Sequence, residues 1–300
     1  MKGVLLLDKP SGMTSHDVVD RIRGAAHTRR VGHTGTLDPS ATGLLIICVG
    51  EATRLSEHLT RLDKVYEGYL RFGVVTDSYD MDGKVLEENS VPDISPEQIQ
   101  KAFDALTGKI QQIPPMVSAV KVGGQRLYKM ARKGETVERK PREVTVKEYR
   151  LLEYEAPLAR FRVECTSGTY VRALCHDVGH SIGCGGTLDS LRRVAVGRYR
   201  VENASPVDAF EDVDDIYERL IPMGEALELP EVVVGPKGEY LVATGGALRR
   251  AELKADCPVT EGWIQVKSAR GELLALARVE QGPAELQVLP KRVFAGRRST

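Results

Sequence analysis

One segment of the sequence restricts the fold of this chain more than any other. Residues 33–43 read HTGTLDPSATG and place a single carboxylate, Asp38, directly before Pro39. Because proline fixes its own φ and keeps the preceding residue out of the α region, the Asp38 side chain is presented in one direction. The apolar residues 44–49 follow at once and predict a buried strand. We therefore expect Asp38 either to face a cleft or a partner at the mouth of this strand, or to form an ordinary Asp-Pro turn.

The chain is long enough for more than one hydrophobic core. Its 300 residues exceed the usual size of a single core, and the pattern changes after Pro230, so we expect domains at residues 1–230 and 231–300. With 42% apolar and 28% charged residues, the composition is that of an ordinary globular protein. No apolar run reaches the roughly 18 residues of a membrane span, and the N-terminus lacks the hydrophobic region of a signal peptide. These features predict a cytoplasmic protein without membrane contact.

The cysteines argue against disulfide and redox chemistry. There are five, an odd number, and no two of them stand in a Cys-x-x-Cys pair. This pattern favours reduced thiols in hydrophobic cores over a disulfide framework. The five are Cys48, Cys165, Cys175, Cys184 and Cys257.

The formal net charge of +0 hides two segregated charge runs. Residues 121–142 hold eight basic residues against two acidic ones, whereas residues 202–231 hold ten acidic residues against one arginine. A charge run is often only a solvated face. A second basic set closely precedes Asp38, however, and two such sets favour a polyanionic partner held through its phosphates. The second set is Arg21, Arg23, Arg29 and Arg30, and the first includes Lys121, Arg126, Lys129 and Arg132.

Periodicity and capping residues predict several elements. Thr14 or Ser15 caps one helix, and Ser95 with Gln98 at the capping-box position starts another. A strand with period two begins near Val65 and places Tyr66, Leu70 and Phe72 on its buried face.

The second half of the chain predicts one more element of chemical interest. Residues 167–169 start a helix whose first turn holds Tyr170 and Arg172, where outward amides and the positive end of the helix dipole favour a carboxylate. The acidic region predicts a helix over residues 213–229. The tail predicts a small barrel of short β-like runs at residues 231–234, 240–243, 263–267, 273–279 and 286–289.

Two stretches suggest metal sites, and neither has a full ligand set. The loop at residues 78–89 resembles a calcium loop, but Ser78 and Asn89 stand where the strongest carboxylate ligands belong. His176 and His180 share a helical face without paired cysteine or glutamate ligands nearby. We expect a turn in the first stretch and a surface histidine pair in the second, with no bound metal.

Taken together, the motifs resemble those of TruB-type pseudouridine synthases, which isomerise the T-loop uridine 55 of tRNA. The similarity runs in order from Lys2 to about Pro230, and the tail resembles, less specifically, the small RNA-binding PUA domain. Val117 stands where relatives often have an aromatic residue. The matching residues are 32–39 with 41–43, 63–66, 76–78 with Asp80 and 82–83, 112–115 with 118–119 and Lys121, 168–172, and 191–193.

The resemblance implies a fold, a reaction and a partner. The fold is an α+β (mixed α/β) catalytic domain on a largely antiparallel sheet, followed by a PUA-like, β-barrel-like domain. The reaction is an isomerisation that requires neither cofactor nor metal. The partner is the T-arm of tRNA, and we expect a monomer that requires no protein partner.

The resemblance also implies roles for individual residues. Asp38 is the catalytic carboxylate, acting as a nucleophile or as a base at the sugar, and Arg172 pairs with it. Tyr66 stacks on the flipped uracil, His33 stacks among displaced nucleotides, and Leu191 lines the pocket. The predicted substrate-binding set also includes Lys9, Lys64 and Tyr170, and the predicted RNA-binding set is Lys121, Arg126, Lys129 and Arg132.

Two other classes of protein share some of these features. A non-catalytic RNA-binding or chaperone protein would share the basic segments, but it would have no need of Asp38. A hydrolase would use Asp38 together with a second acid such as Asp77 or Asp80.

Overall fold

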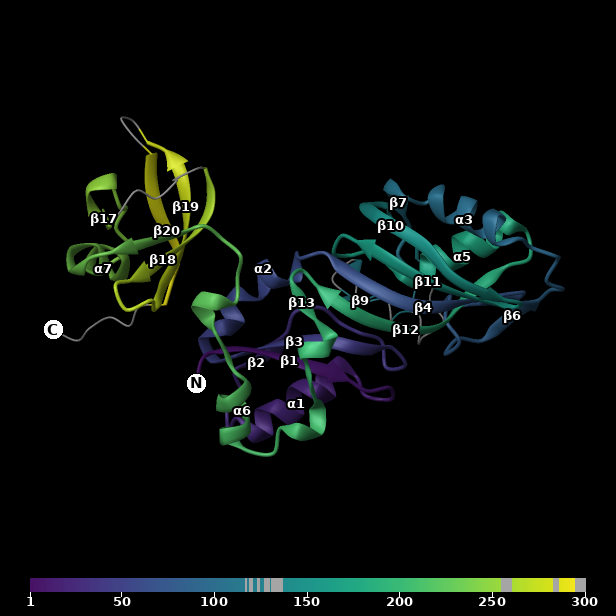
Figure 1. Ribbon diagram of the computed structural model, residues 1–300, viewed down its shortest axis with the longest axis horizontal. Helices are drawn as coiled ribbons and strands as arrows, with labels where there is room; N and C mark the ends of the chain where they lie inside the picture. Colours follow the sequence, from purple (N-terminus) through teal and green to yellow (C-terminus); the bar gives the residue numbers. More distant parts are fainter. Residues whose placement is uncertain are drawn as a thin grey trace.

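The computed structural model describes residues 1–116, 118, 121–122, 125–126, 130, 137–254, 261–282 and 286–294. Within them the chain forms a mixed α/β structure, with a long central sheet and a separate five-stranded sheet near the C-terminus (Figure 1). This agrees with the predicted mixed class. No helix in the described part of the chain is long and apolar enough to cross a membrane.

The central sheet is almost entirely antiparallel. Among the described strands of this sheet, only the β1–β14 and β3–β12 pairs run parallel. The order is β14 (Ser205–Pro206), β1 (Gly3–Lys9), β3 (Thr42–Val49), β12 (Gly186–Val196), β4 (Lys64–Phe72), β11 (Leu158–Cys165), β10 (Arg142–Glu155) and β7 (Gly108–Gln112), with β2 (Val31–His33), β13 (Tyr199–Arg200) and β15 (Ile221–Pro222) pairing at the sides.

The parallel junction between β3 and β12 lies directly after the segment that carries Asp38. Gly43 has φ +101°, and a Cβ atom built there would lie 2.4 Å from the carbonyl oxygen of Arg193. Only glycine therefore allows the two strands to approach at this point. The predicted strand at residues 44–49 is confirmed as part of β3, and it is buried.

The predicted helix starts are confirmed at two positions. Helix α1 (Ser15–Ala25) begins after Thr14, which forms a capping box with Asp17, and α3 (Pro96–Asp104) begins after Ser95, which forms one with Gln98. Short helices at Gly50–Leu55 (η1) and Ser56–Thr60 (α2) follow β3.

Helices α3 and α5 (Val171–Ile182) pack against the same hydrophobic cluster as β4 (Figure 1). Tyr66, Leu70 and Phe72 of β4 are buried there, as the period-two pattern predicts. Helix α1 packs on the other part of the sheet, against β1 and β3.

Strand β10 extends beyond its partner β7, and α3 covers the edge that this leaves. The side-chain amide of Gln100 donates to the Tyr149 carbonyl at 2.9 Å and accepts from the Leu151 N–H at 2.9 Å. One glutamine thus makes the two hydrogen bonds that a neighbouring strand would make.

The predicted helix over residues 213–229 is wrong in extent. Helix α6 (Val213–Arg219) ends before Leu220, which is extended, and Ile221 and Pro222 instead pair with Val4 and Gly3 of β1. The Ile221–Pro222 stretch is therefore held in the central sheet, and a short 3₁₀ turn at Met223–Glu225 (η4) follows it. Two more 3₁₀ turns precede α6, at Val201–Asn203 (η2) and Val207–Ala209 (η3).

The C-terminal sheet contains four of the five predicted β-like runs. Residues 240–243 are the exception: they belong to helix α7 (Pro236–Ala243), which starts with Pro236 at its first position and buries Val242. The strand order is β17 (Leu253–Lys254), β16 (Glu231–Val234), β18 (Gly262–Ser268), β19 (Leu273–Gln281) and β20 (Leu286–Val293), and a 3₁₀ turn at Arg250–Glu252 (η5) precedes β17.

The C-terminal sheet shares a hydrophobic cluster with the rest of the chain. Leu273, Leu276 and Phe294 belong to the same cluster as Leu55 and Leu59 of η1 and α2. Removal of the sheet would therefore expose apolar side chains on the first 230 residues.

The capping box of α3 leads to a stability prediction. Ser95→Ala removes the hydroxyl that accepts from the Gln98 N–H, so the free energy of unfolding should fall by about 1 kcal/mol. Chemical denaturation measures this loss. Ser90→Ala, at an exposed position outside any helix, is the matched control and should change stability by less than about 0.5 kcal/mol. Equal losses in both variants would contradict the capping argument.

Candidate active site

A cavity of about 250 Å³ opens between the Asp38 segment and the N-terminus of α5. Asp38 is the one acidic residue among its described lining residues. The predicted residues Lys64, Tyr66, Tyr170, Arg172 and Leu191 also line it, whereas Lys9 and His33 do not. The other lining residues are 35–37, Ala41, Thr60, Ser118, 166–169, Val171, Leu188 and Arg193.

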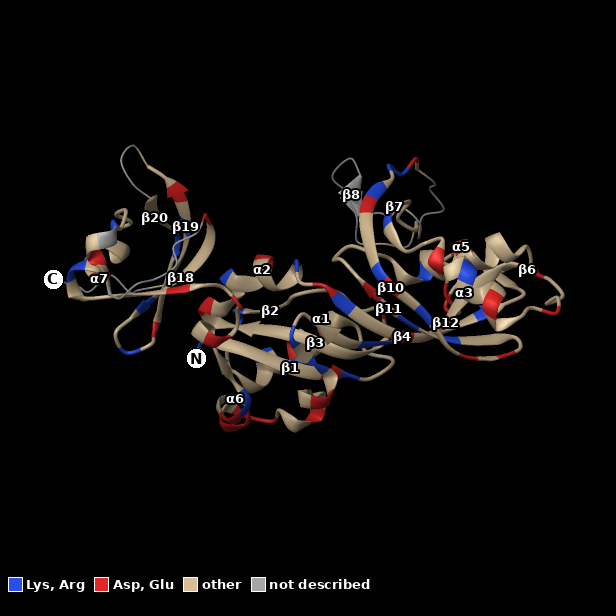
Figure 2. Cartoon of the chain, turned by 45° about the horizontal axis from the view of Figure 1, so that its top comes forward, with Lys and Arg blue, Asp and Glu red and all other residues tan. Residues whose placement is uncertain are grey.

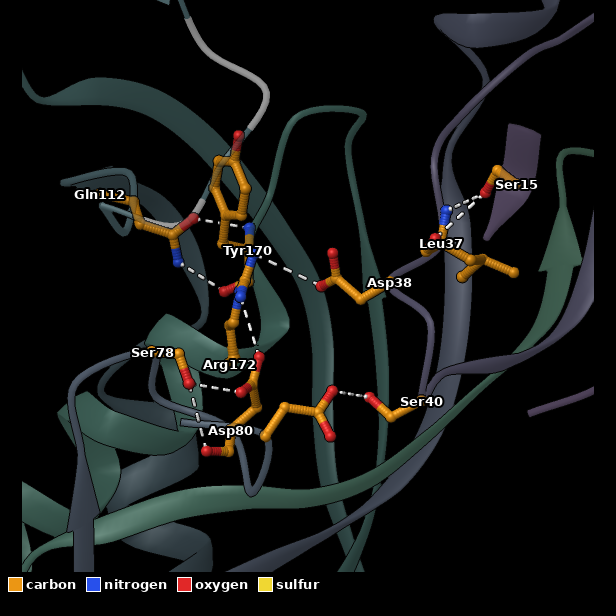
Figure 3. A network of polar contacts seen from close by, with 10 residues as sticks. Ser15, Leu37, Asp38, Ser40, Ser78, Asp80, Gln112, Tyr170 and Arg172 are labelled. Atoms are coloured by element: carbon orange, nitrogen blue, oxygen red, sulfur yellow. Dashed lines mark hydrogen bonds and ion pairs between the residues drawn. The ribbon is translucent and has the colours of Figure 1, made fainter. Parts of the chain in front are cut away.

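The Arg172 guanidinium lies between two carboxylates (Figure 3). Its Nη2 atom is 3.4 Å from Asp38 Oδ2, and its Nη1 atom is 2.8 Å from Asp80 Oδ2. The side chains of Arg172 and Asp80 are 5% and 11% exposed, but that of Asp38 is 47% exposed. The pairing of Arg172 with Asp38 matches the expectation, whereas sequence reasoning took Asp80 for part of a turn.

Asp80 is fixed by its own loop and by β12, where it forms a parallel bridge with Leu188. The Ser78 hydroxyl bonds to its Oδ1 atom, and the Thr76 hydroxyl donates to its backbone carbonyl at 2.7 Å. Tyr79, at φ +66°, stacks on His176 with ring centroids 4.0 Å apart. His176 is one turn along α5 from Arg172, so the loop contacts one face of the helix at two successive positions.

The Asp38 segment is held from the opposite side. The Ser15 hydroxyl accepts from the Leu37 N–H at 2.8 Å and donates to the Leu37 carbonyl at 3.1 Å (Figure 3). The Lys9 ammonium donates to the Pro39 carbonyl at 3.1 Å and also to the Pro10 and Met13 carbonyls. Lys9 is fully buried and is not among the described lining residues of the cavity, so its role is to tie the Asp38 segment to the turn that follows β1.

The N-terminus of α5 is held by a side chain from β7. Helix α5 starts after Tyr170, which provides no side-chain cap. The Gln112 amide accepts from the Tyr170 N–H at 2.7 Å and donates to the Tyr170 carbonyl at 3.0 Å. The positive end of the helix is thereby fixed toward Asp38, which is the arrangement expected for a carboxylate at a helix N-terminus.

Tyr66 and two buried cations form the inner wall of the cavity. Arg193 donates from Nε to the Leu44 carbonyl at 2.7 Å and from Nη2 to the Gly35 carbonyl at 3.0 Å. The Lys64 ammonium donates to the Leu62 carbonyl at 2.5 Å, and burial, aided by the Arg193 charge, lowers its pKa to about 8. Sequence reasoning gave Arg193 no role, although it lies in the quoted 191–193 motif.

His33 ends β2 and lies at the start of the Asp38 segment. Its Nδ1 atom accepts from the Gly35 N–H at 3.4 Å, and burial lowers its pKa, so the neutral ring is favoured.

Burial raises the pKa of the Asp38 carboxyl above its usual value. The Arg172 charge acts in the opposite direction, whereas the charges of Asp80 and Asp82 add to the rise. Arg172 thus favours the ionised form, but its charge does not offset the effect of burial on the pKa of Asp38. A carboxylate with a raised pKa is a stronger base than a solvent-exposed one.

The predicted RNA-binding residues lie largely beyond what the structure describes. Lys121 belongs to β8 (Lys121–Val122) and Arg126 to β9 (Gln125–Arg126), which pair as a short hairpin. Lys129 and Arg132, and most of the predicted helical stretch at residues 126–133, lie outside the described residues. The predicted acidic run is gathered on and around α6 (Figure 2).

Among the described residues, no three His, Cys, Asp or Glu side chains are grouped as metal ligands. The stretch that resembles a calcium loop forms a turn in which the Lys84 N–H donates to Asp77 Oδ1 at 2.9 Å. This turn joins the hairpin strands β5 (Val74–Thr76) and β6 (Val85–Glu88), so the second half of the stretch at residues 78–89 is largely strand β6.

The chain is similar to known proteins over most of its length. Residues 23–171 match the model of the TruB family pseudouridylate synthase N-terminal domain, and residues 172–228 match that of the tRNA pseudouridylate synthase B C-terminal domain. A relative from Opitutus terrae, named tRNA pseudouridine synthase B, is 48% identical over 75% of this chain and 95% of its own length. A relative of the same name from Thermobifida fusca is 42% identical over 98% of this chain and 99% of its own length.

Solved structures share the fold. A chain of an H/ACA RNP bound to a substrate RNA containing 2'-deoxyuridine aligns with a TM-score of 0.74 at 24% identity, over 99% of this chain and 86% of that one. A chain of a Cbf5-Nop10-Gar1 complex aligns with a TM-score of 0.74 at 28% identity, over 98% of this chain and 85% of that one.

The electrostatics of Asp38 lead to a titration prediction. The Asp38 carboxyl should titrate above the usual value of 3.8 in ¹³C NMR, because burial disfavours its charged form. Asp82→Asn removes one of the charges that raise this pKa and should move the midpoint downward.

Asp93→Asn is the control for this titration, because Asp93 is exposed and is not among the charges that act on Asp38. A midpoint at or below 3.8 in the wild-type protein would contradict the claim that burial outweighs the Arg172 charge at Asp38.

Proposed function

The chain belongs to the TruB family of pseudouridylate synthases, and from that membership we propose that it isomerises uridine 55 in the T loop of tRNA to pseudouridine. The enzyme is an isomerase, as its family is. The observation that carries the catalytic assignment is Asp38, the one acidic residue among the described lining residues of the cavity, facing the buried Arg172.

The reaction exchanges one bond of the nucleoside for another. The bond from the sugar C1' to N1 of uracil breaks, and a bond from C1' to C5 forms; C5 loses a proton and N1 gains one. Electrons and atoms balance without an oxidant, a reductant or water. The reaction therefore requires a group that assists the departure of the base, a pocket that retains the detached base, and proton transfer.

In the proposed mechanism Asp38 supplies the first requirement. Its half-exposed carboxylate attacks C1' as a nucleophile or removes a proton from the sugar as a base, and both routes use the same ionised group. Arg172, anchored by Asp80, orients this group and favours its charged form.

The walls of the cavity suit a detached uracil. Tyr66 presents a ring on which the base stacks, and Leu191 and Leu188 supply apolar contact. A base reaches such a pocket only when it is extruded from the T loop, which costs a few kcal/mol. Stacking of the base on Tyr66 and of displaced nucleotides on His33, together with Tyr170 and Lys64 around the pocket, would offset that cost.

Contact with the rest of the tRNA is assigned to two regions. The basic residues of the 121–142 segment, among them Lys121, Arg126, Lys129 and Arg132, would hold phosphates of the T-arm. Residues 231–300 would act as a PUA-like RNA-binding domain with a boundary near Pro230. The sheet packs on Leu55 and Leu59, which favours a fixed extension of the RNA-binding surface.

The alternatives fit the geometry less well. A binding module without catalysis has no use for a carboxylate held against a buried arginine. A retaining glycosidase needs two carboxyl groups about 5 Å apart across an open site. Here Asp80 is buried and bonded to Arg172 and Ser78, so it is not presented to the cavity as a second acid.

The catalytic assignment leads to a mutational prediction. Asp38→Asn keeps the shape of the side chain but removes both its nucleophilic and its basic character, so pseudouridine formation in unmodified tRNA should fall by at least about 100-fold. Mapping of pseudouridine along the tRNA measures conversion, and filter retention measures binding, which should change less than about twofold.

Asp93→Asn is the control for this variant, since Asp93 is exposed, and it should retain full conversion. Near wild-type conversion by Asp38→Asn would return the protein to the class of RNA-binding modules. Conversion at another uridine would overturn the assignment to position 55 alone.

A further inference from the structure

Ser118 has a buried hydroxyl in the wall of the active-site cavity. Its relative exposure is 5%, and it is one of the described lining residues. Its Oγ atom has no hydrogen-bond partner among the residues that the structure describes. Its backbone N–H is used locally, donating to the Met116 carbonyl at 3.0 Å. A buried polar group without a partner destabilises a fold, so such groups call for an explanation.

Three other hydroxyl groups, by contrast, have hydrogen-bond partners. Thr166 Oγ1 accepts from the Thr145 N–H at 2.9 Å, and Thr169 Oγ1 donates to the Thr166 carbonyl at 2.9 Å. Ser15, which is also buried, bonds the Leu37 N–H and carbonyl. Among these four hydroxyls, only that of Ser118 has no hydrogen-bond partner in the described part of the chain, and Ser118 is a lining residue of the cavity.

We propose that the Ser118 hydroxyl forms a hydrogen bond with the uridine nucleoside that enters the cavity. This inference rests on the proposed function. A uridine nucleoside presents carbonyl oxygens, an imide N–H and ribose hydroxyls, and a serine hydroxyl both donates and accepts. A rotation about χ1 would bring this hydroxyl to the cavity, where the substrate would supply the bond that is missing among the described residues.

Ser118 lies in the chain between Gln112 and the basic segment at residues 121–142. Gln112, six residues earlier, holds the backbone of Tyr170 at the start of α5, and the basic segment begins three residues after Ser118. A single stretch of chain thus runs from the support of Arg172 to the phosphate-binding residues. Ser118 contacts the substrate between these two points.

The test compares two buried serines. Ser118→Ala should lower kcat/KM on unmodified tRNA about tenfold, because it removes a hydrogen bond to the substrate. It should leave Tm unchanged or raise it, because the hydroxyl has no partner in the described part of the chain. Ser15→Ala, which removes a hydroxyl with two backbone bonds, should lower Tm. A lower Tm in Ser118→Ala with unchanged kcat/KM would overturn the proposal.

Binding measurements distinguish the two parts of the nucleoside. Filter retention would compare T-arm RNAs carrying uridine or 2'-deoxyuridine at the target position. An equal loss of affinity in Ser118→Ala with both RNAs assigns the bond to the base, and a loss with uridine alone assigns it to the ribose 2'-hydroxyl. Equal binding by wild type and variant to both RNAs overturns the contact.

The same measurements separate this inference from the proposed function. A wild-type protein that forms no pseudouridine in tRNA would refute the function, and the Ser118 contact would then be judged by the binding comparison alone. A wild-type protein that converts uridine 55, with a Ser118→Ala variant of equal kcat/KM and equal binding, would refute only the contact.

Discussion

The arrangement of this protein depends on how one buried guanidinium shares its charge. Arg172 is almost fully buried, and a buried cation must be paired. Asp80, at 2.8 Å and itself buried, satisfies most of that need, whereas Asp38 lies at 3.4 Å and is half exposed. Because Asp80 stabilises the cation, Asp38 is oriented by Arg172 without being enclosed by it. The carboxylate therefore stays accessible to a substrate.

Asp38 and Arg172 are both positioned through the backbone of a nearby residue, which is held by a side chain from a distant part of the chain. Ser15 in α1 bonds the N–H and the carbonyl of Leu37, and Gln112 in β7 bonds the same two groups of Tyr170. Two bonds to one residue restrict both translation and rotation of the backbone. The parallel junction of β3 and β12, made possible by Gly43, sets the Asp38 segment beside Arg193.

Local signals in the sequence predicted local structure, and they did not predict contacts between distant segments. The capping residues and the buried face with Tyr66 depend on residues near one another in the chain, and they appear as expected. Asp80 and Arg193 gain their roles from partners far along the chain, which no periodicity contains. Lys9 was assigned to the substrate, although three backbone carbonyls satisfy its ammonium group. The run at 240–243 is too short for its period to distinguish a strand from a helix.

The glutamine that covers the edge of β10 also affects how two copies of this chain could meet. An uncovered strand edge offers a row of donors and acceptors on which another chain can add as a new strand, which is a common start of aggregation. At Tyr149 and Leu151 those groups are occupied by Gln100. Helix α3 thus both packs on the core and shields this edge from self-association at high protein concentration.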